Sequence, residues 1–443
     1  MKPLYLLFFT VFFAPPLFAY IDPGTGSMLF SLLTGIAVTV FFFLKNLLLK
    51  ARTGFFSREA IKKQQRRYGL VIYSEGKQYW NVFKPILEEL ARREISAVYY
   101  ASSEDDPGLA FSAPGIHREY IGKGNAAYRF LNFLEADICL MTTPGLDVLQ
   151  LKRSPGVRHY IHILHMVTDA TTYRLFGIDY YDSVFLTGEY QKKDIRLLEK
   201  KRGFPEKKLV VVGCTYLDVM GEHLAGLPKT EKGDAQKTVL VAPSWGQNGI
   251  LTRYGLKMLL PLAKSSYQVI IRPHPQSMIS EKDRIEKLRA ALEVYTNVEW
   301  SFDPENLRAL SRSDVLISDF SGIIFDYAFL FNRPVVYPRF EFDRRPYDLA
   351  DIDEEAWTFR AIGEIGFSLG EESFDDIEKI LDDLPYAGKE KRDLIQGLKE
   401  EAYMYPGEAG KRSVDALLKI QEELGQQSGP ATSARKGRYS NNG

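Results

Sequence analysis

The chain has 443 residues, of which 45% are hydrophobic and 26% charged, enough for two full domains after any N-terminal appendage. Its 57 Lys and Arg residues balance 57 Asp and Glu residues, and zero formal net charge argues against a nucleic-acid partner. The two cysteines, Cys139 and Cys214, both lie in apolar runs typical of strands. They offer neither a disulfide framework nor a metal-type spacing, so we expect both thiols in the core.

Two apolar segments open the chain. Residues 4–19 resemble the apolar region of a signal peptide with a tolerable cleavage site at Ala19, and are either removed or retained as a helix. Residues 28–49 are long enough to span a bilayer; the alternative is an apolar core helix of a soluble protein. Seven basic residues against the single acid Glu59 follow, namely Lys50, Arg52, Arg58, Lys62, Lys63, Arg66 and Arg67. We therefore predict a protein of the inner (plasma) membrane whose remaining chain is cytoplasmic.

Strand-like and helix-like segments alternate from Tyr68 onward. In the first half we predict strands at 70–73, 95–100, 137–141 and 159–164, and helices at 80–93 and 126–134. In the second half we predict strands at 238–243, 268–271, 298–300, 314–317 and 335–337, and helices at 256–262, 278–292, 323–330 and 409–424. This alternation is typical of parallel sheets covered by helices on both faces.

The chain is thus predicted to be α/β, with two Rossmann-like, doubly wound domains and an interdomain cleft. The predicted divisions are a signal-like or first membrane segment (1–19), a transmembrane helix with a basic collar (20–67), an N-terminal Rossmann-like domain (68–226), a C-terminal Rossmann-like domain (238–424) and a disordered tail (425–443). Ligands of such domains bind at the carboxyl ends of the strands.

A hydroxyl-rich turn joins the strand at 314–317 to the next helix. Ser318, Ser321 and the amide of Gly322 are placed to hold a phosphate at the positive end of that helix. The charge of Asp319 disfavours a phosphate contact, so this residue either caps the helix or binds a ligand hydroxyl. Asp326, one turn further, either binds a ligand hydroxyl or is a solvated or capping carboxylate.

A second polar turn, Arg272-Pro273-His274-Pro275, follows the strand at 268–271. Arginine presents a fork that matches a phosphate, and a histidine there can donate to a phosphoryl oxygen. The alternative is a rigid turn with exposed polar side chains. Ser244, at the end of the strand at 238–243, is a further ligand contact or a plain loop residue.

These motifs, with Ala242-Pro243-Ser244-Trp245 and Arg333-Pro334, resemble the donor-binding half of the CDP-glycerol glycerophosphotransferase family, which includes teichoic acid primases and polymerases. The resemblance spans about residues 155 to 345. It implies a GT-B-type fold and transfer of a polyol phosphate from a CDP-activated donor, with no cofactor and no metal. The donor-site residues it implies are Arg272, His274, Ser318, Asp319, Ser321, Gly322, Asp326 and Ser244.

The resemblance also assigns a general base. The family carries a histidine at the end of an N-domain strand, which corresponds to His165, with Asp169 as an orienting partner. The alternative is a satisfied structural histidine. Three positions depart from the family pattern: Met166 stands where glycine is common, Gly322 where a second serine is common, and Cys214-Thr215-Tyr216 where proline and arginine are expected.

We expect a membrane-anchored transferase that moves glycerol- or ribitol-phosphate from a CDP-alditol to a lipid-linked glycan or teichoic-type acceptor, as in teichoic acid or other cell envelope polysaccharide biosynthesis. The basic collar would lie beside anionic headgroups. Two alternatives stay open: a GT-B glycosyltransferase that uses a nucleotide sugar, and a non-catalytic member of a polysaccharide assembly system.

Overall fold

A computed structural model describes Val40 and residues 67–226, 236–303, 306–339, 341–384 and 388–426. The predicted segment 1–19, nearly all of 20–67, residues 227–235 between the two predicted domains and the tail after 426 lie outside these residues. Among the residues described, no helix is both long and apolar enough to cross a membrane.

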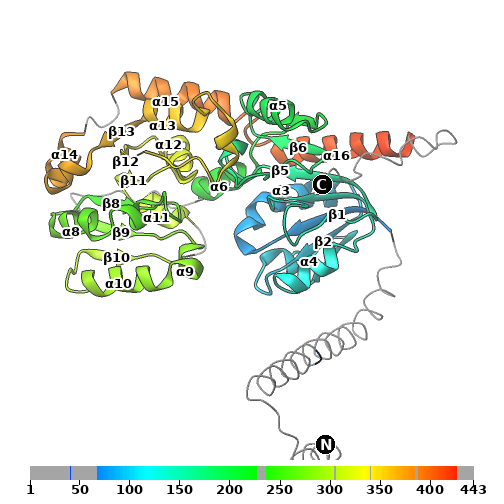
Figure 1. The fold of residues 1–443 in the computed structure, drawn as a ribbon, viewed down its shortest axis with the longest axis horizontal. Helices are drawn as coiled ribbons and strands as arrows, with labels where there is room; N and C mark the ends of the chain where they lie inside the picture. Colours follow the sequence, from blue (N-terminus) through cyan, green and yellow to red (C-terminus); the bar gives the residue numbers. More distant parts are fainter. Residues whose placement is uncertain are drawn as a thin grey trace, which may run out of the picture. The chain divides into compact units, whose positions relative to one another are not determined.

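Two parallel sheets organise the chain from Arg67 onward (Figure 1). The first has seven strands in the order β3-β2-β1-β4-β5-β6-β7. These strands are β1 (Tyr68–Ser74), β2 (Ala97–Ala101), β3 (Ile116–Tyr120), β4 (Ala136–Met141), β5 (Val157–Ile163), β6 (Ser183–Leu186) and β7 (Lys208–Val211). Their connections contain the helices α3 (Trp80–Arg92), α4 (Asn125–Leu131), α5 (Gln191–Arg202) and α6 (Thr215–Gly226), and the short helices η1 (Lys77–Tyr79), η2 (Pro107–Leu109) and η3 (Ala170–Thr172).

The second sheet has six strands in the order β10-β9-β8-β11-β12-β13. They are β8 (Thr238–Val241), β9 (Gln268–Ile271), β10 (Val298–Trp300), β11 (Val315–Ile317), β12 (Val335–Pro338) and β13 (Gly366–Leu369). Around them lie α7 (Ile250–Arg253), α8 (Leu256–Lys264), α9 (Ser277–Ser280), α10 (Lys282–Leu292), α11 (Leu307–Arg312), α12 (Ile323–Phe331), α13 (Trp357–Ile365), α14 (Ile377–Asp383), α15 (Lys389–Ala402), α16 (Ala409–Gln426), η4 (Asp348–Asp351) and η5 (Glu371–Asp376).

The first strand of each sheet, β1 or β8, is the third strand in its order. The chain therefore adds strands first on one side of it and then on the other, so each half is doubly wound. Val71 of β1, for example, pairs in parallel with Val98 of β2 and Cys139 of β4. Alternate residues of β1 enter two different cores: Ile72 packs with α3 and α16, and Tyr73 packs in the cluster on the other face. Both cysteines are free and buried, as expected. The predicted arrangement of two parallel-sheet α/β domains is therefore confirmed.

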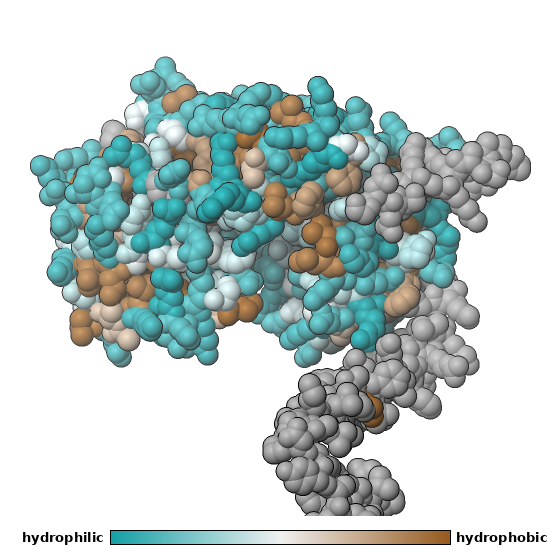
Figure 2. Space-filling view, viewed as in Figure 1, coloured by the Kyte–Doolittle hydropathy of each residue, from teal (hydrophilic) through white to brown (hydrophobic). Residues whose placement is uncertain are grey.

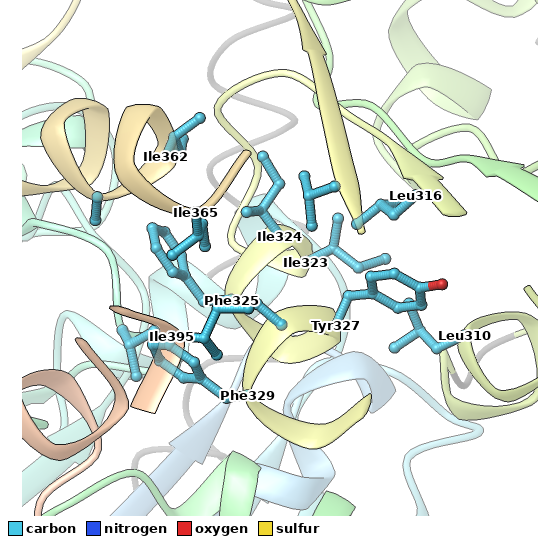
Figure 3. Close-up of a cluster of buried hydrophobic side chains, with 14 of the residues drawn as sticks. Leu310, Leu316, Ile323, Ile324, Phe325, Tyr327, Phe329, Ile362, Ile365 and Ile395 are labelled. Carbon is cyan, nitrogen blue, oxygen red and sulfur yellow. The ribbon is translucent and has the colours of Figure 1, made fainter. Parts of the chain in front are cut away.

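Helix α12 carries the N-terminus predicted to hold a phosphate, and its residues from Ile323 to Phe329 are all buried. Phe325 and Phe329 face Ile365 of α13 and Ile395 of α15, whereas Tyr327 faces Leu310 of α11 (Figure 3). The helix ends at Asn332, whose left-handed backbone closes the last turn. Because neighbours pack around α12, its N-terminal turn is held at the carboxyl end of β11.

Helix α16 differs from the prediction, which assigned it to the C-terminal domain. It packs on α3 and shares the core of the first sheet through Val414, Leu417 and Ile420. Asp218 of α6 anchors the crossing, because its carboxylate accepts hydrogen bonds from the Ala409 backbone N–H and from two other groups nearby. The sequence predicted the apolar stripe of α16 correctly. It did not predict which sheet the stripe covers, because that depends on the contact between Asp218 and Ala409. The predicted helix 278–292 is also two helices, α9 and α10, with a break at Glu281.

Candidate active site

Loops at the carboxyl ends of strands from both sheets meet at one place, and Figure 2 shows the surface hollowed between the two halves. The loop after β5 carries His165 and Met166, and the turn after β11 carries Gly322. A Cβ atom added at Gly322 would lie 3.2 Å from Met166 Sδ, so these two loops are in contact. His274, after β9, lies close enough for its charge to lower the pKa of His165. The structure therefore brings the loop of the predicted base into contact with the turn that carries Gly322, and places His274 within electrostatic reach of His165.

Two side chains hold His165 through the same ring nitrogen. Its Nδ1 is 2.9 Å from Thr142 Oγ1 and 3.5 Å from the Tyr173 hydroxyl. Tyr79 packs edge-on against the ring, with centroids 5.2 Å apart. Among the described residues Nε2 has no protein partner, so this nitrogen is left for a ligand. Burial, and secondly the charge of His274, lower the pKa of His165 to about 4, which keeps the imidazole neutral at pH 7.

The predicted partner, Asp169, does not orient His165. Its Oδ2 accepts the Thr358 backbone N–H at 2.6 Å, and its own N–H donates to Thr358 Oγ1 at 3.0 Å. The side chain is therefore directed to the start of α13, and Thr142 and Tyr173 take the place it was expected to fill. Sequence reasoning missed Thr142, although a hydroxyl directly after the buried strand β4 is the same signal that singled out Ser318.

His162, three residues earlier and on strand β5, is fully buried and extends the hydrogen-bonded group around His165 toward the interior. Its Nε2 is 3.1 Å from the Tyr173 hydroxyl, which also faces His165. Burial lowers the pKa of His162 to about 3, so it too is neutral. The Tyr173 hydroxyl thus links two imidazoles.

His274 is half-buried and its tautomer is fixed by the backbone. The Gln276 N–H donates to His274 Nδ1 at 3.0 Å, so in the neutral ring the proton is on Nε2. Burial lowers its pKa to about 4, which favours that neutral form. The ring lies beside Trp245, with centroids 6.5 Å apart. His274 therefore presents an N–H donor rather than a cation.

The guanidinium of Arg272, predicted to hold the donor, is occupied within its own half. It donates to Asn306 Oδ1 at 2.9 Å, to Ser301 Oγ at 3.2 Å and to the Asp303 carbonyl at 2.6 Å. The residue is only 7% exposed. In this structure Arg272 fixes the loop between β10 and α11, and three of its five N–H donors are engaged inside this half.

Three other predicted donor residues also have internal partners. Ser318 donates to the Ala242 carbonyl at 2.6 Å. Asp319 accepts hydrogen bonds from the Ser244 hydroxyl at 2.7 Å and from the Ser244 and Ile250 backbone N–H groups. Asp319 is therefore a capping residue, which is one of the two roles predicted for it. It caps α7 and the loop after β8, however, and not α12 as predicted.

Ser321 and Gly322, unlike Ser318 and Asp319, are only half-buried. No described side chain bonds the Ser321 hydroxyl. The departures from the family pattern at Met166 and Gly322 touch each other, and a serine at position 322 would press against the Met166 thioether. The space that a serine side chain would occupy at position 322 is thus partly filled by the Met166 side chain from the other loop.

Asp326 is turned away from this turn and into the junction of the two halves. It bonds Tyr216, at the start of α6, and burial raises its pKa to about 7. Tyr216 in turn accepts from Asn306 Nδ2 at 3.2 Å. Tyr216, which replaces an expected arginine, therefore joins Asp326 and the Arg272 network, and the geometry favours neither a solvated nor a ligand-bound carboxylate.

Comparison with known proteins bears on this site. The family model described as CDP-Glycerol:Poly(glycerophosphate) glycerophosphotransferase matches residues 193–360, which include the whole of the hydroxyl-rich turn. No curated protein sequence matches the chain.

Solved structures share the fold at low identity. The UDP-GlcNAc 2-epimerase of Neisseria meningitidis bound to UDP-GlcNAc is similar over 80% of this chain and 100% of its own, with 16% identity and a TM-score of 0.53. The Methanocaldococcus jannaschii UDP-GlcNAc 2-epimerase in complex with UDP-GlcNAc and UDP gives 13% identity and a TM-score of 0.52, over 80% of this chain and 100% of its own. Both likenesses support the GT-B-type arrangement of two α/β domains.

Proposed function

We propose that the chain is a transferase that moves a polyol phosphate from a CDP-activated donor to a lipid-linked glycan or teichoic-type acceptor, because its residues 193–360 match the CDP-Glycerol:Poly(glycerophosphate) glycerophosphotransferase family. The observation that carries this proposal is the meeting of His165, with a free Nε2, and the turn at Ser321 and Gly322. A neutral base thus lies beside the turn that would hold a phosphate.

In the proposed reaction the acceptor hydroxyl attacks the phosphorus that carries the polyol. A bond forms between the acceptor oxygen and that phosphorus, and the phosphorus–oxygen bond to CMP breaks. CMP leaves with the bonding electron pair, and the hydroxyl proton goes to His165 Nε2. The Nε2 lone pair of His165 is available in the tautomer that carries its proton on Nδ1. In that tautomer Nδ1–H donates a hydrogen bond to Thr142 Oγ1.

The donor phosphates would be held from the C-terminal half. His274 supplies a neutral Nε2–H, Ser321 a hydroxyl, and the start of α12 the backbone N–H of Gly322 and the positive dipole end. Donors of this kind stabilise the charge that develops on transferred phosphoryl oxygens. The proposal requires no cofactor and no metal ion.

The proposed location is the inner membrane, with both α/β domains in the cytoplasm. Its support is the apolar run 28–49 and the basic residues that follow it. A topology reporter fused after Gly443 should report a cytoplasmic location, and a signal from the opposite side of the membrane would contradict the proposal.

The direct test is release of CMP from CDP-glycerol or CDP-ribitol by the full-length protein in the presence of a lipid-linked acceptor. Release that is lost in His165→Gln, while the variant still binds CDP, supports the proposal. A variant that turns over normally would reject His165 as the base and favour a non-catalytic or differently built site.

A further inference from the structure

Arg174, on the loop after η3, is a cation without an acidic partner. It is exposed, and among the described residues no carboxylate or carbonyl pairs with its guanidinium. The guanidinium carbon lies 5.3 Å from the ring centre of Trp245 and 5.8 Å from that of Tyr347. An arginine held by aromatic faces keeps its N–H groups available at its edge.

The backbone fixes Arg174 against the C-terminal half. It forms an antiparallel bridge with Tyr347, flanked by hydrogen bonds from Leu175 N–H to the Pro346 carbonyl (3.3 Å) and from Asp348 N–H to the Tyr173 carbonyl (2.9 Å). The same loop thus carries Tyr173 toward His165 and Arg174 toward Trp245.

Asp348 strengthens this attachment. Its buried carboxylate accepts the Phe176 N–H at 2.6 Å and the Gly177 N–H at 3.1 Å, and pairs with Arg202 of α5 at 2.7 Å. The position of Arg174 is therefore set by contacts on both sides of it, and not by the side chain alone.

The two basic side chains predicted for the donor site are either engaged elsewhere or neutral. Arg272 is occupied by Ser301, Asn306 and Asp303, and His274 is held as a neutral donor. A nucleoside diphosphate carries charges that a neutral donor set compensates poorly. Arg174 lies beside Trp245, which in turn lies beside His274, so the indole of Trp245 stands between the guanidinium and one of the groups proposed to hold the phosphates.

We propose that Arg174, from the N-terminal half, binds the diphosphate of the donor, in the role that the sequence motif assigns to Arg272. This inference rests on the proposed function and deepens it, since it makes the diphosphate a bridge between the halves. A donor bound in this way contacts Arg174 on one side and His274 on the other.

The test is a titration of full-length wild type and Arg174→Gln with CDP and with cytidine. Loss of a charged hydrogen-bonding partner should weaken CDP binding about 10- to 100-fold and leave cytidine binding unchanged. Because Arg174 is exposed and unpaired, the unfolding temperature should stay within about 2 °C of wild type. The matched control is Arg412→Gln, since Arg412 of α16 also stacks on a tyrosine, Tyr405, but pairs with Glu408.

The outcomes separate this inference from the proposed function. Equal CDP affinity in wild type and Arg174→Gln, or equal weakening in Arg412→Gln, overturns the role of Arg174 alone. If wild type binds UDP or GDP but not CDP, the proposed donor is wrong, and the same comparison with that diphosphate and its nucleoside decides on Arg174. If wild type binds no nucleoside diphosphate, both proposals fail.

Discussion

Replacing Arg272 by alanine should cost stability more than donor affinity. The substitution removes the donors to Asn306 Oδ1, Ser301 Oγ and the Asp303 carbonyl, at a site that is 7% exposed. A buried polar group left without its partner costs about 1–3 kcal/mol, so the three contacts, partly replaced by water, predict a loss of about 3–5 kcal/mol in the free energy of unfolding.

The assay is denaturant unfolding of the full-length protein followed by circular dichroism, together with CDP titration under conditions where the variant stays folded. Arg272→Lys is the matched variant, because it keeps the charge and loses the fork that reaches three acceptors. We expect it to be destabilised too, with CDP affinity within about threefold of wild type if no phosphate contact is lost. Unchanged stability with CDP binding weakened about 10- to 100-fold would refute this reasoning and return Arg272 to the donor site.

Three further predictions follow from the same geometry. His165→Gln should abolish CMP release with CDP affinity retained; loss of CDP binding would move His165 to the donor site. Ser321→Ala should weaken CDP binding, whereas Ser318→Ala should lower the free energy of unfolding by about 1 kcal/mol through its lost bond to the chain, and the reverse pattern would contradict the assignment of the two hydroxyls. The pKa values of His162 (about 3), His165 and His274 (both about 4) lie below the ordinary 6.5, so these three imidazoles bind fewer protons in the folded chain than in the unfolded chain between these values. Their contribution to the free energy of unfolding should be complete above about pH 6.5 and be lost as the pH is lowered toward 4, whereas the raised pKa of Asp326 (about 7) acts in the opposite direction. Urea unfolding of wild type and His162→Phe isolates the contribution of one ring: the difference between the two proteins should shrink from pH 7 to pH 4, and an equal difference at both pH values would contradict the burial of His162.

Local sequence patterns were sufficient to predict the buried strands and the amphipathic helices of both halves. The strands contain the continuous apolar runs 70–73 and 269–271 because both faces of a parallel sheet are buried, and the helix at 80–92 shows its buried stripe directly in the sequence. Helix α16 has an equally clear stripe, but no local signal tells which sheet it covers. That choice depends on Asp218 and the core of α3, which are far away in the chain.

The site shows the same division. The sequence located the correct loops, because polar residues directly after buried strands mark the carboxyl edge of a sheet. It could not distinguish inward from outward side chains within a loop. Ser318 and Ser321 are three residues apart and chemically alike, yet one bonds the Ala242 carbonyl and the other is free of such a bond among the described residues.

The partners of His165 were also beyond local reasoning. Asp169 is near it in sequence, but the backbone turns the carboxylate to Thr358, nearly two hundred residues later. Thr142 comes from the neighbouring strand β4, and its relation to His165 exists only once β4 and β5 are paired.

The measurement that tests the account most directly is a nucleotide screen on the full-length protein. Unfolding temperatures would be recorded with CDP-glycerol, CDP-ribitol, CDP, UDP, GDP and UDP-GlcNAc. The account predicts that cytidine compounds alone raise the unfolding temperature. Stabilisation by UDP or GDP compounds, with none by cytidine compounds, would contradict a CDP-activated donor and indicate a nucleotide-sugar glycosyltransferase built on the same fold.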